Sequence, residues 1–232
     1  MRRYLLTALG VMAMLVGMTA GVLAQDDVVE ESYRATLQPM NPDIVGSETT
    51  GTVLITFAGD KVTFQAEMQG APPDVAHWQH IHGFAMGEQA SSCPADDADA
   101  NDDGIIDLIE TEESAGTTMI PLNDDPVAFD IPADTYPVAD ENGTYTYEAT
   151  VEKDELEDAF SEHFPDADGL NFENRVVFVH GVADDTELPD SVQSLGEIPA
   201  TTTLPIACGE LDAADSGTPI ATPASPVPDD QG

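Results

Sequence analysis

Short runs of β-branched and aromatic residues, each ended by a polar turn, limit the folds open to this chain more than any other feature of its sequence. The clearest pair is 51–57 and 61–68, which Ala58-Gly59-Asp60 separates as a hairpin turn would. Further runs lie at 33–37, 144–151, 175–180 and 203–208. Only 153–160 has the pattern of a short helix. The chain is therefore predicted to be all-β, with an antiparallel sandwich or barrel as its architecture.

The 232 residues predict one folded domain with an extension at each end. Residues 1–24 have a positively charged start, an apolar stretch over 5–20 and small residues before a cleavage point after Ala24, as in a secretory signal peptide. The apolar stretch is nearly long enough for the alternative, an N-terminal membrane anchor. Residues 212–232 are rich in Pro, Thr and Ala and are predicted to form a disordered tail. This leaves 25–211 as the β domain of a protein that is secreted or lies on the outside of the cell envelope.

The chain is strongly acidic, with 45 Asp and Glu against 6 Lys and Arg and a net charge of -39. Binding to nucleic acid through phosphates is excluded, because phosphates require cationic side chains. An anionic membrane surface is excluded for the same reason. The acidity fits a high-salt exterior in which carboxylates keep a protein soluble, and the alternative is simple drift on a secreted surface. No protein partner can be identified from the sequence.

Two cysteines, Cys93 and Cys208, lie in the exported part of the chain. An even number of cysteines in an oxidising compartment predicts one disulfide. Closing a loop of more than 100 residues would contribute on the order of 4–5 kcal/mol in the chain-entropy model. The alternative is two free buried thiols.

The segment 99–110 has the pattern of an EF-hand calcium loop. Glycine stands at position 6, where such a loop turns sharply, and the apolar Ile106 stands at position 8. Calcium takes six to eight oxygen ligands, and a bidentate carboxylate at position 12 is typical. The predicted ligands are the side chains of Asp99, Asn101, Asp103, Asp107 and Glu110 and the carbonyl of Ile105.

This loop departs from the usual EF-hand in its surroundings. The preceding residues 91–98 contain Pro94 and do not predict an entering helix, and the sequence has no second loop to pair with the first. We therefore predict one structural calcium site that orders a long loop. Extracellular modules of this kind bind calcium with dissociation constants of about 10⁻⁴–10⁻³ M.

Histidines 80 and 82 are two residues apart in a stretch expected to be a strand. Residues at i and i+2 project from the same face of a strand, so both rings can reach one metal ion. His180 ends a separate apolar run and could complete the set from across the sheet. His77 is an odd number of residues from His80 and would face elsewhere. The alternative is a pair of surface histidines without a metal.

Six landmarks in a fixed order resemble the copper/zinc superoxide dismutase family, a family of Greek-key β-barrels. They are His77, His80, His82, Cys93, His180 and Cys208. The resemblance covers about 62–210. It implies that His80, His82 and His180 are copper ligands, that His77 is a structural histidine, and that Cys93 and Cys208 form the intrachain disulfide.

The chain also departs from that family. The family has a bridging histidine and a zinc cluster between its first cysteine and the late strand, where this chain has only His163. Zinc is therefore not expected, and calcium at 99–110 would take over the ordering of this loop. Pro205 stands where the family has an arginine that attracts superoxide.

The sequence therefore predicts a secreted metal-binding protein that holds calcium and copper, with slow turnover of superoxide. The stretch His80-Ile81-His82-Gly83 also resembles the chordin-type repeat, a β module that is not known as an enzyme. The alternative is accordingly a calcium-stabilised β module that serves in binding or in the structure of the envelope, without catalysis.

Overall fold

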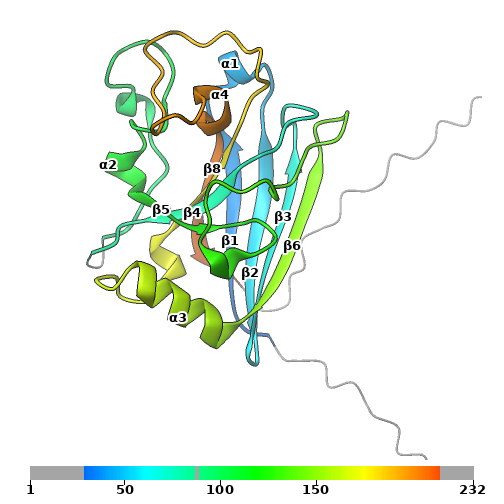
Figure 1. Ribbon diagram of the computed structural model, residues 1–232, viewed down its shortest axis with the longest axis vertical. Coiled ribbons are helices and arrows are strands. Elements are labelled where there is room, and N and C mark those ends of the chain that lie inside the picture. Colours follow the sequence, from blue (N-terminus) through cyan, green and yellow to red (C-terminus); the bar gives the residue numbers. More distant parts are fainter. Residues whose placement is uncertain (1–28, 87–88, 215–232) are drawn as a thin grey trace, which may run out of the picture.

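The strands of this chain join in one antiparallel sheet. The computed structural model describes residues 29–86 and 89–214, in which eight strands follow the order β5-β4-β7-β8-β1-β2-β3-β6. Their bounds are β1 Val29–Pro39, β2 Thr50–Ala58, β3 Lys61–Gln69, β4 Gln79–Gly83, β5 Thr117–Pro121, β6 Tyr145–Glu152, β7 Val176–His180 and β8 Pro205–Ala213. The sheet is strongly curled into a half-barrel (Figure 1).

Four α-helices accompany the sheet in the described part of the chain, and three of them are single turns. They are α1 Pro42–Val45, α2 Glu112–Ala115, α3 Lys153–His163 and α4 Ala200–Thr203. Helix α3 follows β6 directly and lies at one end of the half-barrel, below β4 and β5 in Figure 1. It buries Leu156 and Phe160, and acidic residues in its first turn complement the positive end of the helix dipole.

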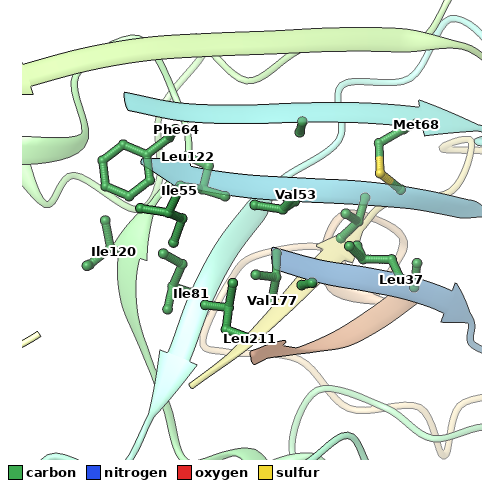
Figure 2. Close-up of a cluster of buried hydrophobic side chains, with 14 of the residues drawn as sticks. Leu37, Val53, Ile55, Phe64, Met68, Ile81, Ile120, Leu122, Val177 and Leu211 are labelled. Atoms are coloured by element: carbon green, nitrogen blue, oxygen red, sulfur yellow. The ribbon is translucent and has the colours of Figure 1, made fainter. Parts of the chain in front are cut away.

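The main core fills the concave side of the sheet. Strand β3 shows how the sequence produces it, because Val62, Phe64, Ala66 and Met68 are buried while their neighbours are not. This period of two places one row of side chains inside. Figure 2 shows Phe64 and Met68 packing with apolar residues from the other strands. Burying each such large side chain stabilises the fold by about 1.5–3 kcal/mol.

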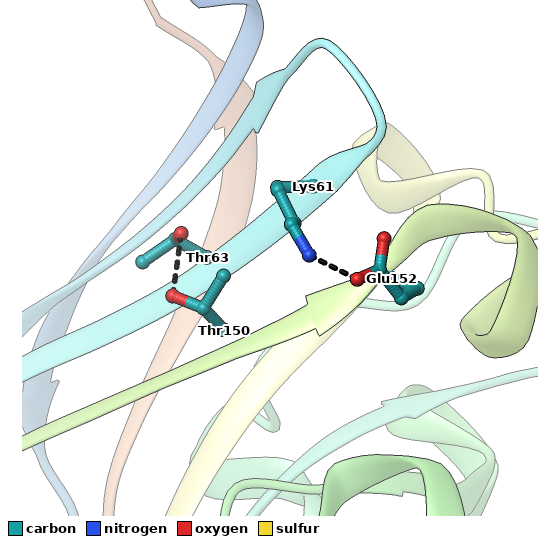
Figure 3. Close-up of polar contacts among 4 residues, drawn as sticks. All are labelled: Lys61, Thr63, Thr150 and Glu152. Carbon is teal, nitrogen blue, oxygen red and sulfur yellow. Dashed lines mark hydrogen bonds and ion pairs between the residues drawn. The ribbon is translucent and has the colours of Figure 1, made fainter. Parts of the chain in front are cut away.

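The opposite face of β3 and β6 carries polar side chains. The hydroxyls of Thr63 and Thr150 are 2.9 Å apart, and Lys61 pairs with Glu152 (Figure 3). Both pairs join residues that lie directly opposite each other across the two strands. Such exposed cross-strand pairs contribute only a fraction of a kcal/mol each and mainly keep this face soluble.

The half of the sheet that contains β4 and β7 is buried on both faces. All five residues of each strand are buried. Ile81 and Val177 belong to the main core, whereas Val176 and Phe178 pack in a second cluster with Met40, Ala115 and Cys208. Loops therefore cover the outer face of these strands and make a second enclosed layer there.

The strands and the helix expected from the sequence are confirmed, although the bounds differ. Strand β5 was not predicted. The all-β class is confirmed, and the single curled sheet is consistent with the barrel alternative, whereas the Greek-key topology implied by the resemblance stays a prediction. Strand β8 continues to Ala213, past the tail boundary expected at 212. The expected signal peptide at 1–24 and the tail from 215 onward lie outside the described residues. No helix in the described ranges is long and apolar enough to cross a membrane.

Candidate metal centre

Strands β4 and β7 bring three histidines together on the loop-covered face of the sheet. His80 and His82 are two apart on β4, as the alternation of a strand requires. His180 ends β7, and its backbone NH bonds to the Trp78 carbonyl (2.7 Å), which places it diagonally across from His80. The ring centroids are 5.3 Å apart for His80 and His180, and 5.9 Å for each of the other two pairs.

The spacing of the nitrogen atoms suits a single metal ion. One ligand nitrogen from each of the three rings lies within 4.8 Å of the other two. Among residues 29–86 and 89–214, no other group of three or more His, Cys, Asp or Glu residues brings its ligand atoms this close together. The three side chains are 2–3% exposed. The predicted convergence of His180 with the His-x-His pair is therefore confirmed, and the cluster can hold a metal ion.

One nitrogen of each histidine is occupied by a protein oxygen. His80 Nε2 lies 2.9 Å from the Tyr136 hydroxyl, and that hydroxyl donates to the Ile131 carbonyl at 2.9 Å. The hydroxyl can therefore accept from His80 Nε2–H. His180 Nδ1 donates to the Thr203 carbonyl at 2.8 Å, because a carbonyl only accepts.

The other nitrogens of His80 and His180 have no partner. His80 Nδ1 and His180 Nε2 are buried and unbonded. His82 Nδ1 is buried and makes no well-aligned hydrogen bond, but the backbone of Gly116 lies near this ring and raises its pKa against the larger effect of burial. His82 Nε2 lies 3.2 Å from the Thr118 hydroxyl. For His80 and His180 the occupied nitrogen carries the proton, so the unpartnered nitrogen presents a lone pair, which is what a metal ligand needs.

Burial keeps these rings neutral. It lowers the pKa of His82 to about 3 and that of His180 to about 4, with the neighbouring His180 lowering the value for His82 further. The pKa of His80 is also well below its usual value, because of burial first and the two other rings second. At neutral pH all three side chains are therefore uncharged imidazoles, the form that binds metals.

A small cavity of about 40 Å³ opens beside the cluster. His80 and His180 line it together with Trp78, Leu108 and Leu195. Because a single water needs roughly 10–15 Å³, the cavity has room for only a few small atoms. Larger cavities elsewhere, such as the one between Lys153 and Asn171, do not touch the histidines.

The two remaining histidines lie apart from the cluster. The ring nitrogens of His77 lie 3.1 Å from the carbonyl of His180 and 3.0 Å from that of Pro72, so this buried ring ties β4 to the end of β7. His163, at the end of α3, is exposed and stacks on Phe129. Neither histidine contributes to the three-nitrogen group.

The predicted disulfide is confirmed. Cys93 and Cys208 are bonded, with their Cα atoms 5.9 Å apart. The bond joins the connection between β4 and β5, which carries Cys93, to Cys208 on β8, which is paired with Phe178. A disulfide is typical of an extracellular or otherwise oxidising compartment.

The acidic loop 99–110 has the turn that its sequence predicts. Gly104 has a φ of +85°, and the carboxylate of Asp99 accepts from the NH groups of Asp103 (3.1 Å) and Gly104 (2.8 Å). The two Glu110 oxygens accept from the NH groups of Ala100 (2.9 Å) and Asp107 (3.0 Å), so the last residue of the loop returns to its start. These carboxylates are not drawn together as closely as the histidine nitrogens are. Calcium here stays a prediction.

The remaining predicted ligands lie in the same loop. Asn101 Oδ1 accepts from Asp103 NH at 2.9 Å, and Ile105 NH donates to Asp103 Oδ1 at 2.9 Å. Only a short 3₁₀ turn, Asp96–Ala98, precedes the loop, in agreement with the missing entering helix. One oxygen of Asp107 accepts from Gln193 NH at 2.6 Å, which ties the loop to the segment near the histidine cavity.

Two residues with a role in these sites carry no signal in the sequence. Tyr136 orients His80 from a loop between β5 and β6. Asn41 holds Ile106, the apolar residue of the acidic loop, through two hydrogen bonds of 2.9 Å, one to its NH and one to its carbonyl. Neither belongs to a repeated pattern, so only the three-dimensional structure reveals them.

Comparisons with known proteins do not assign the chain to a family. A scan against models of protein families finds no match, and a search of curated proteins finds none. The kinship with copper/zinc superoxide dismutases therefore stays a prediction.

Proposed function

We propose that this chain is an exported copper-binding protein whose ligands are His80, His82 and His180. The observation that carries the proposal is the convergence of three buried histidines, two of which, His80 and His180, present an unpartnered ring nitrogen with a lone pair. Leaving a buried polar atom unpaired costs about 1–3 kcal/mol, so two such nitrogens beside a third histidine require a reason. A metal ion bound by one nitrogen of each ring supplies it.

The donor set favours copper. Neutral imidazole suits several transition metals, and copper binds nitrogen donors most tightly among the divalent ions of the first row. A structural zinc site normally has four protein ligands, whereas this group contains three, so zinc here would need a water as its fourth ligand. When bound, copper would supply one-electron chemistry of the kind that superoxide dismutation requires.

Several features support kinship with the copper/zinc superoxide dismutases. The bonded cysteines are the pair that the resemblance implies, and the buried ring of His77 lies between two backbone carbonyls, one of which accepts its N–H, as for a structural histidine. Other features argue for weak turnover. His163 lies outside the cluster, and Pro205 offers no positive charge to attract an anion. We therefore expect dismutation to be slow, and copper binding without dismutation would favour the non-catalytic alternative.

The test is to load the purified protein with copper, remove the excess and measure the copper bound per chain. We expect one equivalent for the natural chain and a loss of binding in a His82→Gln variant. His163→Gln is the matched control, because His163 is exposed and lies away from the cluster. No retained copper at saturation, or equal binding by His82→Gln, would refute the proposal. Superoxide consumption by the loaded protein then separates a slow dismutase from a binding protein.

We also propose calcium binding by the loop 99–110, supported by its ligand pattern and by the return of Glu110 to the start of the loop. A calcium chelator should lower the melting temperature. The variant Glu110→Gln should reduce this dependence, whereas Glu112→Gln, just beyond the loop and exposed, should retain it. A melting temperature that does not respond to the chelator would exclude the calcium site.

A further inference from the structure

The histidine cluster offers a metal ion three donors and no negative charge. The ligand group contains no Asp, Glu or Cys in the described part of the chain. The cavity beside it is lined by apolar side chains, Trp78, Leu108, Ile131, Leu195 and Ile198, and by the hydroxyls of Thr118 and Thr203. A bound ion would therefore keep its whole charge in an environment that solvates charge poorly.

The cost of such a buried charge depends on its size. In a low-dielectric site the loss of solvation grows with the square of the charge, so a divalent ion is penalised roughly four times as much as a monovalent one. Neutral ligands do not offset this difference. Asp107, next to the cavity residue Leu108, is buried but lies outside the ligand group, and most other carboxylates lie on the surface, where salt screens them beyond about 8–10 Å.

The number of donors acts in the same direction. Three nitrogens satisfy monovalent copper, whereas divalent copper prefers a tetragonal set and zinc a tetrahedral one. Because the adjoining cavity is about 40 Å³, at most a few small atoms can complete a larger coordination shell.

We infer that the cluster of His80, His82 and His180 selects monovalent copper over divalent copper and zinc. This inference rests on the proposed copper binding and adds the oxidation state that the site favours. A strong preference for the reduced ion would also slow a cycle that must pass through both oxidation states, in line with the weak dismutation expected above.

The experiment measures the dissociation constants of the full chain for Cu(I), Cu(II) and Zn(II) by competition with chelators specific for each ion, Cu(I) being handled without oxygen. We expect the constant for Cu(I) to be lower than that for Cu(II) by roughly 100-fold or more, with Zn(II) weaker still. Failure to bind copper in either state would overturn the proposed function itself. Binding of Cu(II) as tightly as Cu(I) would overturn only the selectivity.

A pair of variants at Thr118 tests the physical cause. This hydroxyl lies 3.2 Å from His82 Nε2, so Thr118→Asp would place a carboxylate at the cluster, and Thr118→Asn would place a neutral group of the same shape. We expect Thr118→Asp to reduce the preference for Cu(I) at least tenfold relative to Thr118→Asn. Equal preferences in the two folded variants would contradict the charge argument. If the aspartate variant does not fold, the constants of the natural chain still decide the selectivity.

Discussion

The tautomers of His80 and His180 are each set by the oxygen atom that one of the two ring nitrogens contacts. For His80 that oxygen belongs to Tyr136, and for His180 it is the backbone carbonyl of Thr203. A backbone oxygen cannot be removed by substitution, but a hydroxyl can. Tyr136 is therefore a position, like Thr118, at which the geometry of the cluster can be altered without replacing one of its histidines.

Replacing Tyr136→Phe should weaken copper binding about 10–100-fold, the usual effect of losing a hydrogen bond to a ligating histidine. Stability should also fall by about 1–3 kcal/mol, because His80 Nε2 and the Ile131 carbonyl lose their shared partner. Copper affinity and the electron paramagnetic resonance spectrum of Cu(II) measure the first effect. Tyr147→Phe, which loses one hydrogen bond to the Asn123 carbonyl, is the control and should leave the copper affinity and the spectrum unchanged. A normal spectrum and affinity for Tyr136→Phe would show that Tyr136 does not position His80.

The lowered pKa values of four buried histidines, the three of the cluster and His77, predict how the stability of the metal-free protein depends on pH. Between pH about 6.5 and 4 the unfolded chain takes up protons on these histidines and the folded chain takes up fewer, so stability falls as the pH falls. Each histidine contributes at most about 1.4 kcal/mol per pH unit. Urea unfolding from pH 7 to 5 at constant high salt measures this slope. His82→Gln should lower the slope, and an unchanged slope would show that the ring of His82 is not kept neutral.

The three histidines of the cluster could be predicted from the sequence, but the residues that support them could not. The His-x-His spacing fixes which face His80 and His82 share, because alternation in a strand is a local rule. The position of His180 followed from its place at the end of an apolar run. Tyr136 contacts His80 through a loop 56 residues away, and no local rule determines where such a loop passes.

Among the elements, strands with alternating or continuous apolar residues were predictable and β5 was not. Strand β5 is only five residues long and ends in Pro121, so its pattern is too short to indicate a strand although Thr117 and Thr118 are β-branched. It forms because β4 offers it a hydrogen-bonding edge, which is a tertiary effect. The curl of the sheet likewise depends on how all strands meet, so the sequence could not distinguish a half-barrel from a sandwich.

In a paired EF-hand, the backbone of the second loop would bond the apolar residue of the first. In this chain the side chain of Asn41 makes these hydrogen bonds to Ile106. Asn41 contacts both the NH and the carbonyl of Ile106, and its amide also donates to the Pro205 carbonyl at 2.9 Å. Asn41→Ala should therefore destabilise the protein by about 2 kcal/mol more than Asn171→Ala. Both asparagines have a positive φ, 49° and 43°, so the comparison cancels the backbone cost. Equal losses in urea unfolding would show that the Asn41 side chain does not support the loop.

At the scale of the whole molecule, negative charge greatly outweighs positive charge. The net charge is -39, and the exposed pairs Lys61–Glu152 and Lys153–Glu157 engage both lysines of the sequence. Such an excess destabilises the compact state through self-repulsion. We expect the melting temperature to rise by several degrees between about 0.05 M and 1 M NaCl, where the screening length shortens to about 3 Å. KCl should act equally, because screening depends on ionic strength, and a constant or falling melting temperature would contradict this explanation.

The two outer strands of the half-barrel, β5 and β6, are joined to each other along the chain by the connection that carries Tyr136. Were these strands hydrogen-bonded, a tight turn would suffice between them, and no segment would cross to the histidines. Because β5 and β6 are not paired, the connection between them is long enough to pass beside the histidines. Substitutions in the connection that carries Tyr136 can change the surroundings of the three histidines, while the strands that present these histidines keep their sequence.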